Sequence, residues 1–169
     1  MKNVELKVRI DNFGGVISLL KKLQAKHVGR LLQIDTYYNC SNGRLKIRET
    51  KNRASQLVFY KRPDKIGSKT SYYLTNNIER KQTAGLKLIL AEALGEKVVV
   101  KKERDLWLYK NTRIHLDKVK SLGNFLELET MVEKAGHNAK KEHNEIIDLL
   151  NLSKYKTHAK SYSDMLISQ

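Results

Sequence analysis

Strict alternation of apolar and polar residues is the feature that most limits how this chain can fold. In the opening stretch MKNVELKVRI, the apolar residues are Val4, Leu6, Val8 and Ile10, and polar or charged residues separate them. A period of two residues is typical of a β-strand that has one face on a core. Because the alternation returns in many later segments, we expect a β-rich protein whose strands have one apolar and one charged face.

The alternating segments and the turn signals between them predict about eight strands in mostly hairpin order. Asn42-Gly43 favours a hairpin turn, and Gly95 is a plausible helix C-cap. Many short strands of this kind are typical of a barrel or a sandwich. The expected strands are residues 1–10, 31–39, 44–50, 56–62, 68–75, 97–109, 112–119 and 124–132, and the expected helices are 16–23, 79–94, 139–150 and 158–167.

Length and composition narrow the class of protein and its partners. The chain of 169 residues suits one domain, 1–169, and its 33 Lys+Arg against 18 Asp+Glu give a formal charge of +15. Such an excess attracts polyanions, which include nucleic acid, an anionic membrane surface and phosphorylated small molecules. The single cysteine, Cys40, excludes an internal disulfide framework and favours a reducing, cytoplasmic location. We expect no signal peptide and no membrane span, because the sequence has no suitable apolar run.

The charged strand faces have two physical explanations. In an open sheet such a face meets water, which is the simpler explanation for any single strand. In a closed barrel it lines the lumen instead. There Lys and Arg would hold phosphoryl oxygens, and clustered Glu and Asp would hold Mg²⁺ or Mn²⁺. Together these groups would form a site for a polyphosphate with a bound metal.

Particular motifs favour the second explanation, because they follow one another in a known order. Asn3-Val4-Glu5-Leu6-Lys7 stands where a Glu-x-Glu-x-Lys motif would open the chain, and GNFLELE ends the last expected strand. Between and beyond them lie QIDTYY (33–38), GRLKIRE (43–49), VFYKRP (58–63), VVVKKER (98–104), IHLDKVKSLGNFLELE (114–129) and SYSDML (161–166). Over nearly its full length, the chain resembles the CYTH superfamily of triphosphate tunnel metalloenzymes, which includes class IV adenylyl cyclases and thiamine triphosphatases.

The resemblance implies an α+β fold: an eight-stranded antiparallel β-barrel tunnel with flanking helices. It implies a metal-dependent enzyme that acts on the triphosphate of a nucleotide or another organic triphosphate, either a cyclase or a triphosphatase. Mg²⁺ or Mn²⁺ would be held by Glu5, Glu127 and Glu129. The implied phosphate-binding residues are Lys7, Lys46, Arg48, Lys61, Lys102, Arg104 and Arg113, and the implied catalytic residues are Lys7, Arg48 and Asp117.

One residue departs from the family pattern. Asn3 replaces the first glutamate of Glu-x-Glu-x-Lys. An amide oxygen can still ligate Mg²⁺, but it brings no negative charge. A second metal site would therefore be weaker or reorganised, and a non-catalytic binder of polyphosphate or nucleotide stays a second hypothesis.

Other features carry less functional weight. A nucleic-acid-binding barrel ranks last, because the sequence has no evident aromatic platform motif. The stretch GSKT (67–70) lacks the glycine spacing of a phosphate-binding loop. His115 is equally compatible with a tunnel residue and a spectator, whereas His137 and His143 are expected on the surface of a polar helix. The sequence leaves a homodimer open.

Overall fold

The computed structural model describes residues 1–132 and 138–169. These residues form eight strands, four α-helices and one short 3-10 helix. The strands are β1 (Lys2–Arg9), β2 (Lys26–Tyr38), β3 (Arg44–Thr50), β4 (Ser55–Lys61), β5 (Lys69–Ile78), β6 (Glu96–Tyr109), β7 (Thr112–Val119) and β8 (Gly123–Met131). The helices are α1 (Gly14–Lys22), α2 (Arg80–Leu94), α3 (Ala139–Leu149), the 3-10 helix (Leu152–Lys154) and α4 (Tyr162–Ile167).

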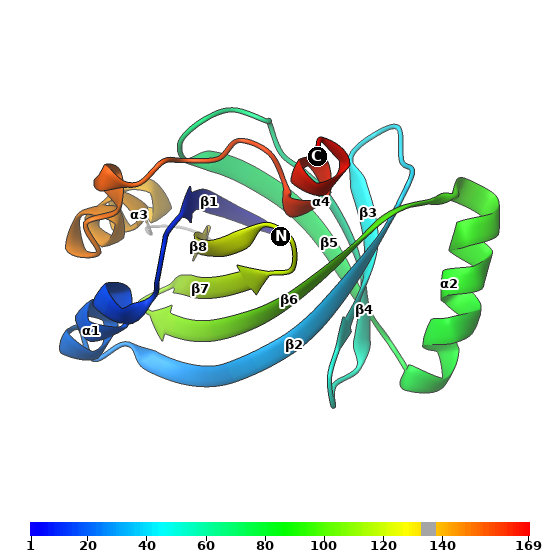
Figure 1. Cartoon of the computed structure of the whole chain (residues 1–169), viewed down its shortest axis with the longest axis horizontal. Helices are drawn as coiled ribbons and strands as arrows, with labels where there is room; N and C mark the ends of the chain where they lie inside the picture. Colours follow the sequence, from blue (N-terminus) through cyan, green and yellow to red (C-terminus); the bar gives the residue numbers. More distant parts are fainter. Residues whose placement is uncertain (133–137) are drawn as a thin grey trace.

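The strands form a closed antiparallel barrel in the order β1-β5-β4-β3-β2-β6-β7-β8, which confirms the expected fold (Figure 1). Closure comes from β1, which pairs with β5 on one side and with β8 on the other. In Figure 1, α1 and α3 lie at one side of the barrel and α2 lies at the other. Within the described residues, no helix has the length and apolarity that a membrane span requires.

The main apolar core lies outside the barrel, between its wall and the helices. Leu6, Ile114 and Leu128 point outward from their strands and pack with Leu20 of α1 and Ile146 of α3. These side chains are almost completely buried, and each buried aliphatic side chain contributes about 1.5–3 kcal/mol. The alternating partners of these residues must therefore point into the barrel, which leaves the lumen to the charged faces.

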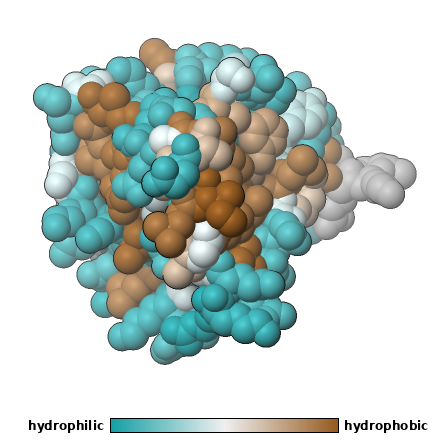
Figure 2. All heavy atoms as spheres, turned by 90° about the vertical axis from the view of Figure 1, so that its right-hand side faces the viewer, coloured by the Kyte–Doolittle hydropathy of each residue, from teal (hydrophilic) through white to brown (hydrophobic). Residues whose placement is uncertain are grey.

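A smaller core fixes α2 to the opposite side of the barrel. Leu86 and Leu90 pack on Tyr38, Ile47 and Ile78 of the barrel wall. The other face of this helix stays exposed, and apolar side chains gather there (Figure 2). The predicted C-cap is confirmed, because Gly95 ends α2 with a positive φ of 76°.

The C-terminal segment closes over one end of the barrel. Tyr162, Met165 and Leu166 pack against inward-facing apolar residues such as Val100 and Phe125. The predicted helix over 158–167 is therefore too long, because α4 begins only at Tyr162. Ser161 caps it, since its side chain accepts a hydrogen bond from the Asp164 amide in a capping box.

The predicted start of β2 is also wrong, because the strand begins at Lys26 and not at residue 31. A register shift between His27 and Gly29 interrupts the pairing with β6, and Gly29 has a φ of 128°. This irregularity breaks the two-residue period that marked the other strands.

The expected surface position of His143 is wrong, whereas His137 lies outside the described residues. The His143 side chain is fully buried. Its Nδ1 lies 2.9 Å from Thr130 Oγ1, and its Nε2 lies 3.1 Å from Ser68 Oγ. The imidazole thus ties α3 to β8 and to the segment before β5. Burial lowers the pKa of His143 to about 4.

This lowered pKa predicts a pH-dependent stability. The folded state favours the neutral imidazole, so its contribution is complete above the unfolded pKa of about 6.5 and is lost as pH falls toward 4. Urea unfolding between pH 7.5 and pH 4.5 should show a loss of up to about 3 kcal/mol from this group. In His143→Gln the free energy of unfolding should change less over this range, and equal slopes in the two proteins would contradict the assignment.

Candidate metal and triphosphate site

Charged side chains of both signs converge inside the barrel around a cavity of about 560 Å³. They come from β1, β3, β6, β7 and β8 and from the segments that follow β3 and β4, whereas β2 and β5 contribute uncharged residues such as Gln33, Tyr37 and Tyr73. The charged lining residues are Glu5, Lys7, Lys46, Arg48, Arg53, Arg62, Lys102, Arg104, Arg113, Glu127 and Glu129.

The strand register explains why opposite charges meet. In the β1–β8 ladder, Lys7 lies opposite Glu127, whereas Glu5 lies opposite Glu129, which has the same charge, and pairs with Arg62 instead. In the β7–β8 ladder, Glu129 lies opposite Arg113. Directly opposite residues on one face of an antiparallel pair have Cβ atoms about 5 Å apart, so their side chains interact. The period of two thus sets up a network of ion pairs across three adjacent strands.

Glu127 is at the centre of this network. Its carboxylate lies 3.2 Å from Lys7 Nζ and 2.7 Å from Arg104 Nη2. Burial opposes the ionised form, but these cations hold the pKa of Glu127 well below its usual range. Burial also lowers the pKa of Lys7, although Glu127 counteracts part of this effect. The carboxylate of Glu127 therefore stays ionised. Lys7 and Arg104, the two cations in contact with it, could also bind another anion.

Glu129 is the second carboxylate of the same strand face. Arg113 Nη2 lies 2.8 Å from it. His115, Arg113 and Arg104 outweigh the effect of burial and lower the pKa of Glu129 to about 2. A site with two ionised carboxylates from alternate residues of one strand suits a divalent cation.

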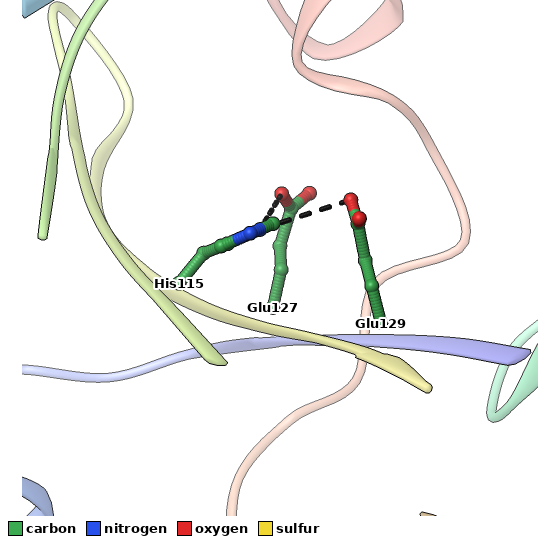
Figure 3. Close-up of side chains that lie close together, drawn as sticks. All are labelled: His115, Glu127 and Glu129. Atoms are coloured by element: carbon green, nitrogen blue, oxygen red, sulfur yellow. Dashed lines mark ion pairs between the residues drawn. The ribbon is translucent and has the colours of Figure 1, made fainter. Parts of the chain in front are cut away.

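His115 completes a cluster with these two glutamates, as Figure 3 shows. One ligand atom from each of the three residues lies within 4.8 Å of the others. The imidazole points from β7 toward the two carboxylates, which rise from β8. This donor set of two carboxylates and one imidazole fits a divalent metal ion.

Glu5 lies beside this cluster but is not part of it. Its carboxylate pairs with Arg62 Nη1 at 3.1 Å, and burial raises its pKa. The neighbouring Asn3 is buried and lines the same cavity, and its Oδ1 has no hydrogen-bond partner within the described residues. The predicted set of Glu5, Glu127 and Glu129 thus separates into a close pair and one more distant carboxylate.

Two buried aspartates fix the cations at the base of the cavity. Asp35 lies 2.7 Å from Lys46 Nζ and 2.7 Å from Arg48 Nε, and Lys102 Nζ lies 3.7 Å away. Although burial raises it, these three cations hold the pKa of Asp35 well below its usual range. Lys102 has a pKa lowered to about 7, first by burial and then by Arg104.

Asp117 holds Arg104 in the same way. Arg104 donates to both of its oxygens, and the Tyr162 hydroxyl donates a hydrogen bond of 3.0 Å. The carboxylate is fully buried, so Asp117 is placed to orient Arg104 and the C-terminal segment.

Lys61 is the predicted phosphate ligand that the structure places elsewhere. It is exposed and does not line the cavity, because the alternation of β4 turns Lys61 outward and the next residue inward. Arg62 takes the inward position, and its side chain is only 4% exposed. The basic motif on this strand therefore contributes its arginine and not its lysine.

Asp35, Arg62 and Lys69 are further interior charges, and none of them was among the predicted site residues. The two-residue period carried a signal for all three. Counting in twos from Tyr37 gives Asp35, counting from Tyr60 gives Arg62, and counting back from Tyr73 through Ser71 gives Lys69. Lys69 is buried, and its pKa is lowered to about 8 by burial and Arg62.

Backbone carbonyl groups of the C-terminal segment accept hydrogen bonds from three of these interior cations. Arg62 and Lys69 donate to the Ala159 carbonyl at 3.0 and 2.9 Å, and Lys7 donates to the Lys160 carbonyl at 3.2 Å. Neutral carbonyl oxygens are weaker partners for cations than phosphoryl oxygens are. Because Lys7 also pairs with Glu127 and Arg62 with Glu5, three cations share two carboxylates in this part of the cavity.

A larger hollow of about 1010 Å³ has a different character. Its lining includes outward-facing residues such as Leu32, Ile34 and Lys101. Leu32 and Lys101 are exposed, and Ile34 is 38% exposed. We place the candidate site in the smaller cavity, because buried carboxylates and buried cations converge there.

Comparisons with known proteins agree with this geometry. The model of the CYTH domain family matches residues 1–162. A protein of Methanocaldococcus jannaschii named "Putative adenylate cyclase" is 34% identical, and the alignment covers 98% of both chains. Among solved structures, a protein of Pyrococcus horikoshii has a TM-score of 0.80 at 25% identity, over 96% of this chain and 98% of that one. A Hippeastrum protein described with a dominant triphosphatase activity has a TM-score of 0.64 at 17% identity, over 98% and 95%, which shows a common fold.

Proposed function

Because the chain belongs to the CYTH domain family, we propose that it is a metal-dependent enzyme that acts on the triphosphate of a nucleotide or another organic triphosphate. The observation that carries this proposal is the convergence of buried cations and ionised glutamates in one interior cavity. Cyclisation of ATP to cyclic AMP and pyrophosphate is the leading reaction, because the relative from Methanocaldococcus jannaschii carries the name "Putative adenylate cyclase".

The ion pairs suggest how substrate would be taken up. Lys7 and Arg104 contact Glu127, and Arg113 contacts Glu129. A triphosphate would draw these cations onto its oxygens, while the freed carboxylates would hold Mg²⁺ or Mn²⁺. The metal would supply charge neutralisation at the phosphoryl oxygens. Partner exchange of this kind leaves no buried charge unpaired before or after binding.

The remaining interior residues would position the phosphates. Asp35 holds Lys46 and Arg48 in fixed directions, and Asp117 does the same for Arg104. Preorganised cations lower the barrier of phosphoryl transfer, because this chemistry needs positioning and charge stabilisation above all. Roles in catalysis for Lys7, Arg48 and Asp117 belong to this proposal.

The nucleophile decides between the two reactions of this site. If the ribose 3′-oxygen attacks the α-phosphorus, a bond forms between these two atoms and the hydroxyl proton passes to solvent water. The bond from the α-phosphorus to the oxygen that bridges to the β-phosphorus breaks, and pyrophosphate departs. If water attacks instead, the enzyme is a triphosphatase. The cavity would hold the triphosphate in both cases, so the products must be measured.

A substrate panel tests the proposal. The protein is incubated with ATP, thiamine triphosphate and inorganic tripolyphosphate, with Mg²⁺, with Mn²⁺ and with a chelator, and cyclic nucleotide, pyrophosphate and phosphate are assayed. We expect turnover that the chelator abolishes. Binding of triphosphate without turnover of any substrate would overturn the enzyme proposal and would favour a non-catalytic polyphosphate binder.

Two neighbouring basic residues provide a matched test of the inside of the barrel. Arg62→Ala should weaken tripolyphosphate binding by about tenfold or more, because a buried charge-assisted contact is lost. Lys61→Ala removes a charge of the same sign one residue away, on the exposed face, and should change the dissociation constant by less than about twofold. Isothermal titration calorimetry at one salt concentration measures both, and equal losses would show that only net charge matters.

A further inference from the structure

In the part of the chain that the structure describes, His115 has a ring nitrogen without a hydrogen-bond partner inside the cluster that it forms with Glu127 and Glu129. The residue is only 4% exposed, and its Nδ1 has no hydrogen-bond partner within the described residues. This atom lies 3.9 Å from Glu127 Oε2 and 3.7 Å from Glu129 Oε1 (Figure 3). Both separations are too long for hydrogen bonds.

An unpaired buried nitrogen of this kind costs free energy. A buried polar atom without a partner destabilises the fold by about 1–3 kcal/mol. The two glutamates do not repair this, because Glu127 contacts Lys7 and Arg104 at short distances, and Glu129 contacts Arg113. A buried nitrogen atom that faces two ionised carboxylates and has no hydrogen-bond partner is in the position expected of a metal ligand.

The spacing of the three donors suits one ion. An ion that binds its ligands at about 2.1 Å holds neighbouring ligand atoms about 3 Å apart and opposite ligand atoms about 4.2 Å apart. The separations of 3.7 and 3.9 Å at His115 Nδ1 lie between these limits. Small rotations of the glutamate side chains would be enough to close the site.

We propose that His115 Nδ1 is a direct ligand of the divalent cation beside Glu127 and Glu129, so that the site prefers a first-row transition ion such as Mn²⁺ to Mg²⁺. The chemistry of the donors gives the reason. Mg²⁺ demands oxygen ligands and keeps its waters, whereas transition ions accept an imidazole together with carboxylates. The inference rests on the proposed function, because it concerns the same cavity and its metal.

Electron spin echo spectroscopy of bound Mn²⁺ tests this ligand without an activity assay. The protein is loaded with one equivalent of Mn²⁺, with and without pyrophosphate, which is an anion free of nitrogen. We expect ¹⁴N modulation in the wild-type protein that is lost in His115→Gln. His27→Gln is the matched control, because His27 also contacts a carboxylate, that of Asp105 at 2.6 Å, but is half exposed.

The metal affinities provide the second readout. His115→Gln should weaken Mn²⁺ binding by about tenfold or more and change Mg²⁺ binding by less than about threefold. Bound Mn²⁺ without ¹⁴N modulation in the wild-type protein would overturn the inference, whatever the variants do. So would the absence of Mn²⁺ binding with and without pyrophosphate. If either result came with metal-dependent turnover in the substrate panel, the proposed function would stand and only the role of His115 would fall.

Discussion

Glu127→Gln is expected to reduce metal-dependent turnover by about 10²-fold or more, while the fold is kept. The change preserves size and shape but removes the charge of the carboxylate that contacts Lys7 and Arg104. The proposed partner exchange fails without it, because the site loses one anionic ligand and the two cations lose their anchor. Steady-state assays over a range of Mg²⁺ and Mn²⁺ concentrations measure the effect.

Glu103→Gln is the matched control for this variant. Glu103 lies on β6, its side chain is 49% exposed, and its nearest cation is Arg30 at 3.8 Å. We expect a rate within about twofold of the wild-type value, because an exposed pair contributes little. If Glu127→Gln kept the wild-type rate and metal response, the assignment of Glu127 as a metal ligand would be wrong.

Asp35→Asn is expected to destabilise the protein by about 3–5 kcal/mol, which is a large share of the stability of a typical domain. Asp35 is 1% exposed and is the shared counter-ion of Lys46, Arg48 and Lys102. Its loss leaves the buried Lys46 and Arg48 without this countercharge, whereas Lys102 also lies 3.7 Å from Asp117. Urea unfolding should show a lower midpoint with an unchanged slope.

A control and a rescue sharpen this prediction. Asp11→Asn, at an exposed position, should lie within about 0.5 kcal/mol of the wild-type protein. Tripolyphosphate should restore part of the stability of Asp35→Asn, because a bound anion supplies the missing negative charge and binds only the folded state. A loss below about 1 kcal/mol would show that Asp35 does not hold the cation cluster together.

Much of the barrel could be predicted because the alternation of its strands has two causes that act together. The outward-facing residues Leu6 and Leu128 pack against the helices, and the inward-facing residues Lys7 and Glu127 form an ion pair with each other. Apolar packing outside the barrel and ion pairing inside it both repeat every two residues. The sequence pattern along β1 and β8 therefore shows which face of each strand is apolar and which is charged. At the start of β2 the period fails, because the bulge near Gly29 shifts the register.

The errors in the site have physical reasons as well. The motif on β4 pointed to Lys61, but the pleat of the strand decides which residue faces inward, and it selects Arg62. Asp35 stands alone among uncharged neighbours, so its importance comes from cations on other strands. His143 is buried by contacts with Ser68 and Thr130, which are distant in sequence. Pairings of this kind depend on the closed barrel and leave no local signal.

Calorimetric titration of inorganic tripolyphosphate into the Mn²⁺-loaded protein tests the central claim most directly. The account predicts one saturable site per chain, for which ATP competes and from which a single-stranded oligonucleotide does not displace the ligand at physiological salt. Tripolyphosphate that fails to saturate, or an oligonucleotide that binds more tightly than ATP and displaces it, would contradict a triphosphate site inside the barrel. That result would assign the charge of +15 to a nucleic-acid surface instead.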